Sequence, residues 1–545
     1  MSGHSQLHPV KSCGQRDSAY GQILRSSVLM GGSSLLVVLI GLIRIKGIAL
    51  MVGPWGMGLW GIYLSIADLV QSLAGLGIIS SGVRQMAAAA GRQNIRLMAS
   101  TAWVLQRVTL VLGCLGTGVL WLMAEPVARW SFGNEQMKGQ VACLSLAIVL
   151  RVMAEGQTAL MQGLRRVDDL ARLNIAVAVW GTVASLAWVY TRGLDGIVPA
   201  LVSLAAINLL VSIRYSRNID LPKGRISTIR IKRNLMSLLG LGSVFLASGL
   251  MVMGTAYLTR LMIVQRFDQY AAGLYQAAFA LGWLYISLVL QGLGSDFYPR
   301  LTAAAHDSLT CNRLVNQQVR MAWILAVPGI LATWILAPIV ITVFYSTAFQ
   351  PSIELLRWMC LAMGFRVFSW PLAFILMAQG SKVRYFLSEA LLTALNLGLT
   401  YLGLKYFGLN GVGMALLMTH VFHTLVLYGM VHYQCGFRWT RENLVGGTVG
   451  MGFIGLVFTG YQVLNDELAS NAGLIAMVIS LIQAARQLLA LIPSQPIFSY
   501  AQTPERRVWR YGILVLMGVW GFWYEAAYGW KTGWNGFATI QEVIP

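Results

Sequence analysis

The sequence predicts an all-α integral membrane protein with about 14 transmembrane helices. Hydrophobic residues make up 57% of the chain and charged residues only 11%, whereas soluble domains carry roughly 25% charged residues. The net charge is +20, but the arginines and lysines gather in short segments between apolar runs. This distribution is typical of the positive-inside rule rather than of nucleic-acid binding. Since no segment between the runs is long enough for a soluble domain, the protein is expected to act within the lipid bilayer.

Apolar runs of about 20 residues, the length that crosses the hydrocarbon core, follow one another along the chain. They cover residues 26–51, 58–82, 98–123, 141–163, 172–190, 194–213, 236–262, 269–294, 319–345, 354–378, 384–406, 408–432, 444–464 and 471–493. A last run, 511–530, contains Glu525 and fits equally well a span or a surface helix. Because basic residues alternate between the connecting segments and concentrate on one side, the N-terminus is predicted to lie in the cytoplasm.

Two segments of the chain resemble each other. Residues 58–90 begin GLWGIYL and residues 273–305 begin GLYQAAF, and both continue through a Gly-Leu-Gly sequence and a basic residue into small residues. The helices that precede them also align, which places Arg44 against Arg260. Six spans separate the copies, so both halves have the same orientation. Two parallel six-helix bundles of this kind are a transporter architecture.

The first of these blocks carries a family resemblance. The run GGSSLLVVLIGLIRIKGIALMVGPWGMGLWGIYLSIADLVQSLAGLGIISSGVRQ (31–85) resembles the polysaccharide and O-antigen translocases of the multidrug/oligosaccharidyl-lipid/polysaccharide flippase superfamily. Residues 271–307 resemble the matching block of that family's second half. The resemblance covers about 22–435 and implies two pseudo-symmetric lobes around a central cavity. It also implies movement of a polyprenyl-diphosphate-linked oligosaccharide from the cytoplasmic to the periplasmic leaflet of the bacterial inner membrane.

The predicted domain organisation combines the repeat with the family core. It consists of a cytoplasmic tail (1–22), a first six-helix lobe (23–213), a basic cytoplasmic linker (214–235), a second six-helix lobe (236–435), and extra C-terminal helices with a tail (436–545). No role is assigned to the last segment, and we expect a monomer.

Ionisable side chains inside an apolar span are costly, so each is a functional candidate. On a helix, Arg44 lies over Gly41 and Val37, a small and partly polar face that predicts contact with protein or a cavity. Lys46 lies on a greasy face near the outer end, and we expect it to anchor the helix at the membrane interface. A guanidinium can hold the oxygens of a diphosphate bidentately, which makes Arg44 and Arg260 the first candidates for substrate binding. The alternative is that each ties helices together through backbone carbonyls.

Three other arginines are candidates for the same anion. Arg84 and Arg300 close the two repeat blocks at the cytoplasmic side, where they are either ordinary positive-inside residues or capture the diphosphate as it arrives. Arg366 lies mid-span beside Pro371. It either satisfies carbonyls that the proline frees or lines the cavity.

Two carboxylates are candidates for coupling transport to a proton or sodium ion, because buried carboxyls are usual ion carriers in secondary transport. Asp68 lies mid-span, with the alternative that it neutralises a cavity arginine, and Glu389 lies in the inner third of its span. Arg151 and Glu155 are four residues apart and are predicted to pair with each other. His420 and His423 are predicted to form hydrogen bonds that pack helices rather than to bind a metal.

Several activities lack their sequence signature. The six cysteines show no metal-type spacing and are read as structural thiols, and no phosphate-binding loop of the G-x-x-x-x-G-K-[ST] type occurs. We therefore expect no metal, no cofactor and no ATP hydrolysis by that route. A cation-coupled multidrug exporter of the same superfamily is the main alternative, although its site should be rich in acids and aromatics. A membrane glycosyltransferase or polymerase is less favoured, since the first outer loop is nearly absent and uncharged.

Overall fold

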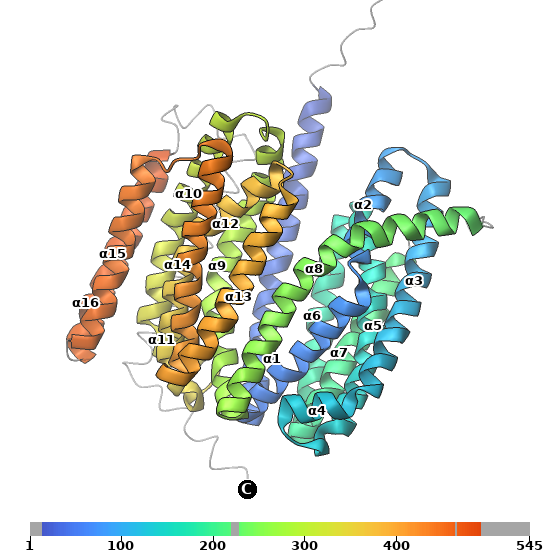
Figure 1. The fold of residues 1–545 in the computed structure, drawn as a ribbon, viewed down its shortest axis with the longest axis horizontal. Coiled ribbons are helices and arrows are strands. Elements are labelled where there is room, and N and C mark those ends of the chain that lie inside the picture. The colour runs from blue at the N-terminus through green and yellow to red at the C-terminus, as the bar shows by residue number, and fades with distance from the viewer. Residues whose placement is uncertain (1–13, 218, 220–227, 464–465, 492–545) are drawn as a thin grey trace, which may run out of the picture. The chain divides into compact units, whose positions relative to one another are not determined.

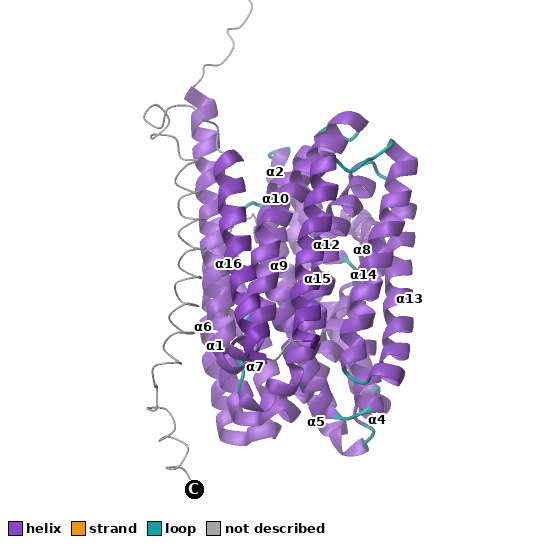
Figure 2. Ribbon diagram, turned by 90° about the vertical axis from the view of Figure 1, so that its left-hand side faces the viewer, coloured by secondary structure: helices purple, strands orange, loops and turns teal. Residues whose placement is uncertain are grey.

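The computed structural model describes residues 14–217, 219, 228–463 and 466–491, and every element in these ranges is a helix (Figures 1 and 2). The chain divides into a unit of residues 35–491 and a second unit formed by 1–34 and 492–545. All contacts described below lie within residues 35–491. The predicted last run, 511–530, falls outside the described residues.

The helices occur in two successive series with a similar order of long and short elements. The first series is α1 (Gly14–Gly75), α2 (Ile78–Gly91), α3 (Ile95–Leu122), α4 (Ala124–Phe132), η1 (Glu135–Met137), α5 (Lys138–Gly163), α6 (Val167–Arg192), η2 (Gly193–Gly196) and α7 (Ile197–Ser216). The second is α8 (Thr228–Arg266), α9 (Gln269–Ala303), α10 (Ser308–Ile335), α11 (Ala337–Phe344), η3 (Thr347–Ser352), α12 (Ile353–Ala378), α13 (Lys382–Phe407) and α14 (Asn410–Cys435). This order confirms two pseudo-symmetric bundles, here called the first and second lobes.

The described helices account for most of the predicted spans. Eleven described segments are long and apolar enough to cross a membrane, and two of them, of 44 and 50 residues, are long enough to cross it twice. The first is broken at Gly53, where the backbone leaves the helical region (φ 62°, ψ −169°), and the second contains η2. The predicted span 236–262 lies inside α8.

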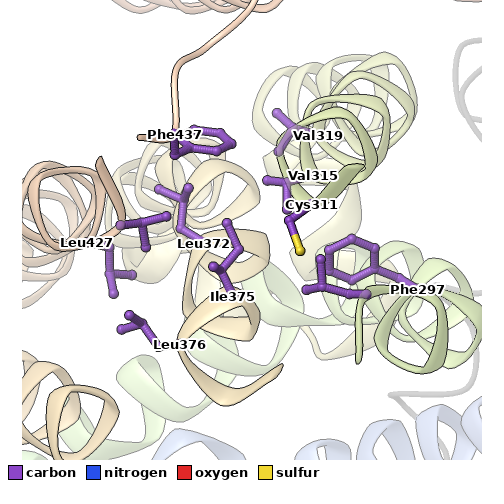
Figure 3. Close-up of a cluster of buried hydrophobic side chains, with 11 residues drawn as sticks. Phe297, Cys311, Val315, Val319, Leu372, Ile375, Leu376, Leu427 and Phe437 are labelled. Atoms are coloured by element: carbon purple, nitrogen blue, oxygen red, sulfur yellow. The ribbon is translucent and has the colours of Figure 1, made fainter. Parts of the chain in front are cut away.

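Each lobe is held together by packing among its own helices. In the first lobe α5 packs on α3 and α7, and α7 packs on α6; in the second, α12 packs on α14, α9 and α10. A cluster of fully buried side chains joins α9, α10, α12 and α14 (Figure 3). It includes Phe297, Val315, Leu372 and Leu427, and Phe437 closes it from the segment after α14. Interlocking of this kind favours movement of a lobe as one body.

The predicted spans differ from the structure at two places. The run 58–82 is interrupted at Leu76 and Gly77, which both have positive φ (45° and 64°), so α1 ends and α2 begins there. The corresponding part of α9 continues without a break. The run 319–345 is two helices, because α10 ends at Ile335 and α11 begins anew with a proline in its first turn, where the missing N–H costs nothing.

Two further helices, α15 (Arg441–Val463) and α16 (Asp466–Leu491), follow the second lobe and pack against α10. Asn316 of α10 is the centre of this attachment. Its amide donates to the carbonyl of Arg438 (3.0 Å), and its side-chain oxygen accepts from the Thr440 N–H and the Asn443 amide (both 2.9 Å). The extension is therefore attached to the second lobe by hydrogen bonds as well as by apolar contact.

Candidate functional site

A cavity of about 320 Å³ lies inside the first lobe, between α1, α5, α6 and α7. Most of its wall is apolar. The charged residues that line it are Arg44 and Arg151, and its uncharged polar lining comes from Asn174, Thr182 and Asn208. A few polar groups in an otherwise apolar wall are typical of a ligand site.

Arg44 faces this cavity together with Gly41 and Val37, which is the face that helical phase predicts for it. Its Nε atom is buried and makes no hydrogen bond to the described residues. Gly41 has open space where a side chain would begin, so it leaves room beside the guanidinium. A buried donor without a partner is destabilising by itself, and a bound acceptor would satisfy it.

Arg151 is the second cation of the cavity, and it pairs with Asp68 of α1 rather than with Glu155. The predicted Arg151–Glu155 pair is wrong: Glu155 instead accepts a hydrogen bond from Gln71. An arginine that precedes a glutamate by four residues is the less favourable order on a helix, and α1 offers a carboxylate at closer range. Asp68 thus takes up the charge of Arg151, and the positive charge of Arg44 stays uncompensated in the cavity lining.

Sequence reasoning missed the three uncharged polar residues of the cavity. Asn174 and Asn208 lie in α6 and α7, and the Thr182 hydroxyl is buried without a hydrogen-bond partner among the described residues. The sequence does contain one indication of these residues, because both asparagines place a polar carboxamide inside a predicted apolar span. What the sequence lacks is the information that these faces of α6 and α7 meet Arg44.

Arg260 does not share this cavity. It is buried on α8, where it donates to Gln276 of α9 (2.7 and 3.2 Å) and to the carbonyl of Ala256 (3.0 Å), and it lies 5.7 Å from the ring centre of Tyr275. Its guanidinium holds α8 against α9. This resembles the alternative role predicted for Arg260, in which it ties helices together through backbone carbonyls.

The repeat register explains why Arg44 and Arg260 differ. Gly58 and Gly273 are close neighbours, and each also lies against the residue four positions before the other: Gly58 against Gln269, and Gly273 against Pro54. The same offset pairs Arg44 with Thr259, so the alignment of Arg44 with Arg260 is wrong by one residue. One residue turns a helix position by about 100°, which sends Arg260 to a different face.

The second lobe contains a polar cluster of its own around Arg366. The guanidinium lies over the Trp283 ring at 4.5 Å, and its buried Nε has no hydrogen-bond partner among the described residues. Glu389 of α13 lies within electrostatic range of it. His420 and His423 are close enough to feel its charge as well. Among the described residues, His420 Nδ1 and both ring nitrogens of His423 have no hydrogen-bond partner, so these atoms do not make the predicted packing hydrogen bonds there.

The remaining candidates lie away from the cavity lining. Arg84 is exposed on α2 and Arg300 is exposed in the last turn of α9. Lys46 is not simply an anchor at the membrane interface, because its Nζ donates to the carbonyl of Thr342 in α11 of the second lobe (3.0 Å). That carbonyl belongs to the last turn of α11, where the helix dipole favours a cation.

Comparison with known proteins identifies a family that this chain matches. A family model described as polysaccharide biosynthesis protein matches residues 48–354. The lipid III flippase of Escherichia coli (strain K12) is 24% identical over 377 residues, which cover 67% of this chain and 88% of that protein, and the same values hold for the lipid III flippase of Shigella flexneri.

Solved structures share the fold. A multidrug-resistance MATE transporter of the MOP superfamily, in an inward-facing conformation, matches with a TM-score of 0.65 and 14% identity over 75% of this chain and 98% of its own. The lipid II flippase MurJ, in an inward closed conformation, matches with a TM-score of 0.62 and 15% identity over 85% of this chain and 100% of its own. The match to MurJ covers 85% of this chain, which is more than the 75% covered by the match to the MATE transporter.

Proposed function

Because this chain belongs to the polysaccharide biosynthesis protein family, we propose that it is a flippase that moves a polyprenyl-diphosphate-linked oligosaccharide from the cytoplasmic to the periplasmic leaflet. The oligosaccharide would be a repeat unit of O-antigen, capsule or exopolysaccharide. The names of the lipid III and lipid II flippases among the similar proteins support this substrate class. The protein is thus a transporter rather than an enzyme.

The observation that carries the proposal is the uncompensated Arg44 in the first-lobe cavity. Asp68 pairs with Arg151, so the lining keeps one net positive charge, and the buried Arg44 Nε has no hydrogen-bond partner within the described part of the chain. A diphosphate offers several anionic oxygens to a guanidinium. Asn174, Asn208 and Thr182 add neutral hydrogen-bonding groups around the same anion.

The same charge balance separates this proposal from its main alternative. A multidrug exporter that carries cationic compounds needs an acidic or aromatic site, and the MATE structures share the fold of this chain. Here no carboxylate is among the residues that line the cavity, and Asp68 is bound to the lining residue Arg151, so a cationic drug would meet a positive lining. The geometry favours an anionic substrate.

The other candidate residues take secondary roles in this proposal. The exposed Arg84 and Arg300 would meet the diphosphate at the cytoplasmic side, and Arg366 would stabilise it in the second lobe. Arg260 would hold α8 and α9 together. Glu389, beside Arg366, is the candidate for coupling to a proton or sodium ion, and Asp68 acts as the counter-charge of Arg151. We place the protein in the bacterial inner membrane as a monomer, with its N-terminus in the cytoplasm.

Replacement of Arg44 tests the proposal. Arg44→Ala should abolish surface polysaccharide in a strain that depends on this gene and should cause polyprenyl-linked oligosaccharide to accumulate. A charge-assisted hydrogen bond contributes about 1.5–3 kcal/mol, so we expect substrate affinity to fall about tenfold to a hundredfold. Arg44→Lys should retain part of the activity, because it keeps the charge but not the bidentate geometry.

Arg107→Ala is the matched control. Arg107 also lies within a span, but it is exposed on α3 beside Trp103 and outside the cavity lining. It should transport normally at the same expression level. Normal surface polysaccharide with Arg44→Ala would disprove the assignment of the cavity.

A further inference from the structure

The two lobes can be compared residue by residue, because the repeat keeps one register along the helices that surround the first-lobe cavity. α5 and α12 each contain 26 residues, as do α6 and α13, and in both pairs the first and the last residues lie 215 positions apart. GLDG (193–196) leads into α7 and GLNG (408–411) leads into α14, and the first glycine of each has a positive φ (57° and 64°). Gly58 of α1 and Gly273 of α9 share this spacing, so residues 215 positions apart are counterparts on all of these helices.

The counterparts of the first-lobe cavity residues are the members of the polar cluster around Arg366. Arg366 itself corresponds to Arg151, and Trp283 corresponds to Asp68, so an ion pair in one lobe is a contact between a cation and an aromatic ring in the other. Four further pairs of counterparts are Leu64 and Phe279, Asn174 and Glu389, Ala205 and His420, and Asn208 and His423. The two lobes therefore present different side chains at the same position of the fold.

Aromatic rings distinguish the second-lobe cluster from the first-lobe cavity. None of the described residues that line the cavity is aromatic, whereas Phe279 and Trp283 lie four residues apart on one face of α9 and are both half-buried. Their ring centres are 6.2 Å apart, and their planes differ by only 9°. Rings in full face-to-face contact would be about 3.5–4 Å apart. Neither ring therefore covers the face of the other, and the pair offers aromatic surface to a ligand.

The cluster also contains buried polar atoms that lack a partner. His420 and His423 are only 3% and 4% exposed, and His420 Nδ1 and both ring nitrogens of His423 make no hydrogen bond to the described residues. A neutral imidazole has one donor and one acceptor, and leaving them unpaired in a buried place is destabilising. A hydroxyl group both donates and accepts, whereas an ionised carboxylate or phosphate oxygen only accepts. Hydroxyl groups are thus the ligands that satisfy both kinds of ring nitrogen.

We propose that this cluster binds the saccharide of the lipid-linked substrate, with a pyranose ring lying on Phe279 and Trp283 and its hydroxyls bonded to His420 and His423. The inference rests on the proposed function, in which the first-lobe cavity binds the diphosphate of the same molecule. A pyranose carries C–H groups on its faces and hydroxyls around its rim. The C–H hydrogens have a small positive charge that suits the negative face of an aromatic ring, and the hydroxyls suit the imidazoles.

A division of the substrate between the lobes accounts for the difference between their sites. A diphosphate requires an uncompensated cation, which Arg44 supplies in the first lobe, and the counterpart of Arg44 is the neutral Thr259. A saccharide requires no net charge, and the charge of Arg366 is opposed by Glu389, where the first lobe has the neutral Asn174. Arg366, beside Trp283, then meets the diphosphate only where it joins the saccharide.

The repeat supplies the substitutions for a test, because the first lobe shows which side chains the fold accepts at each position. Phe279→Leu introduces the side chain of its counterpart Leu64, and His420→Ala introduces that of Ala205. Phe422→Leu is the matched control. It makes the same change as Phe279→Leu on α14, at an exposed residue outside the cluster. Thermal unfolding midpoints of all variants are recorded beside that of the parent.

Binding is measured by native mass spectrometry on the full-length protein in lipid nanodiscs with two lipids. One is undecaprenyl diphosphate, which carries no sugar, and the other is the polyprenyl-linked oligosaccharide extracted from a strain that lacks this gene. The parent should bind the glycosylated lipid more tightly. Phe279→Leu and His420→Ala should each weaken binding of the glycosylated lipid about threefold to tenfold and leave binding of undecaprenyl diphosphate unchanged. Phe422→Leu should change neither.

Three results would overturn the inference. They are equal binding of the two lipids by the parent, unchanged binding of the glycosylated lipid by both cluster variants, and an equal loss for both lipids in Phe279→Leu and His420→Ala. If one of these variants does not fold, the other decides, since they act on different helices.

Arg44→Ala separates this inference from the proposed function. It should weaken both lipids alike, because both carry the diphosphate. Normal binding by Arg44→Ala, together with a selective loss in Phe279→Leu and His420→Ala, would keep the saccharide site and remove the diphosphate site. A loss for both lipids in Arg44→Ala without any loss in the cluster variants would do the opposite. Binding of neither lipid by the parent would overturn both.

Discussion

Arg44 and Lys46 are two residues apart on α1, and helical geometry sends them to different surroundings. The phase of the helix predicts that Arg44 faces a small and partly polar surface, and the structure places it in the first-lobe cavity. The same reasoning predicts that Lys46 lies on an apolar face of the helix. It does not predict that Lys46 donates to the carbonyl of Thr342, because that residue lies nearly three hundred positions away in sequence. Single-helix geometry gives the direction of a side chain, and tertiary packing decides what it meets.

Thr182 offers a prediction at this scale. Its buried hydroxyl has no partner among the described residues, and an unpaired buried polar group destabilises the fold. Thr182→Val should therefore raise the free energy of unfolding by about 1 kcal/mol, seen as a higher unfolding midpoint in detergent. If the hydroxyl contacts the substrate, the same variant should reduce transport.

Thr419→Val is the control for Thr182. The Thr419 hydroxyl is equally buried, but it donates to the carbonyl of Ala415 (2.7 Å) in the second lobe. Its replacement should not raise the midpoint and should leave transport unchanged. A stable Thr182→Val protein with full transport would exclude this hydroxyl from substrate binding.

At the scale of the helices, apolar runs predict the spans well because the bilayer imposes a minimum length on each. The ends of α12, α13 and α14 agree with the predicted runs to within a few residues. Breaks are predicted less well. Leu76 adopts a positive φ without being glycine, and nothing in an apolar run marks such a position. The short α4 and α11 are too short to give a hydropathy signal.

The hydrogen bonds that attach the start of α15 to Asn316 of α10 can be tested by mutation. Asn316→Ala removes the acceptor of the Thr440 N–H and one of the two acceptors of the Asn443 amide, which keeps the Asn316 carbonyl (2.8 Å). A typical hydrogen bond contributes about 1 kcal/mol to stability. Hydrogen exchange followed by mass spectrometry should then be faster in residues 438–446, while α12 and α14 keep their protection. The control Asn312→Ala, whose side-chain oxygen has no partner among the described residues, should leave exchange unchanged. Equal exchange in Asn316→Ala and the parent would contradict the role of Asn316.

At the scale of the whole molecule, the repeat predicts two lobes but not their internal chemistry. The order of α3, α4 and α5 returns in α10, α11 and α12, so the architecture follows from duplication. The residues that line the cavity cannot be predicted from the repeat in the same way, because that would require an alignment of the two copies that is correct at every residue. A shift of one position rotates Arg260 away from the place of Arg44, and the choice of Asp68 over Glu155 as partner of Arg151 depends on which helices are neighbours.

The orientation of the whole molecule in the membrane can be tested with reporter fusions. Basic residues concentrate on one side of the predicted spans, and such segments remain in the cytoplasm. Alkaline phosphatase fused within η2 should be active, because this turn is expected in the periplasm, whereas a fusion after Ser216 should be inactive. Green fluorescent protein at the same positions should give the reverse pattern. Activity of the enzyme at the second site would contradict the predicted topology.

Gly58 of α1 and Gly273 of α9 approach each other closely, each against the other helix's backbone, and this contact also bears on how such a molecule could arise. A contact in which residue i touches j while j touches i is the isologous contact of a two-fold dimer. A half-length ancestor that paired with a second copy of itself would have formed the whole crossing from one glycine. Fusion of two such copies would free the halves to diverge, and the break at Leu76–Gly77, which α9 lacks, is a difference that a symmetric dimer could not carry in one subunit alone.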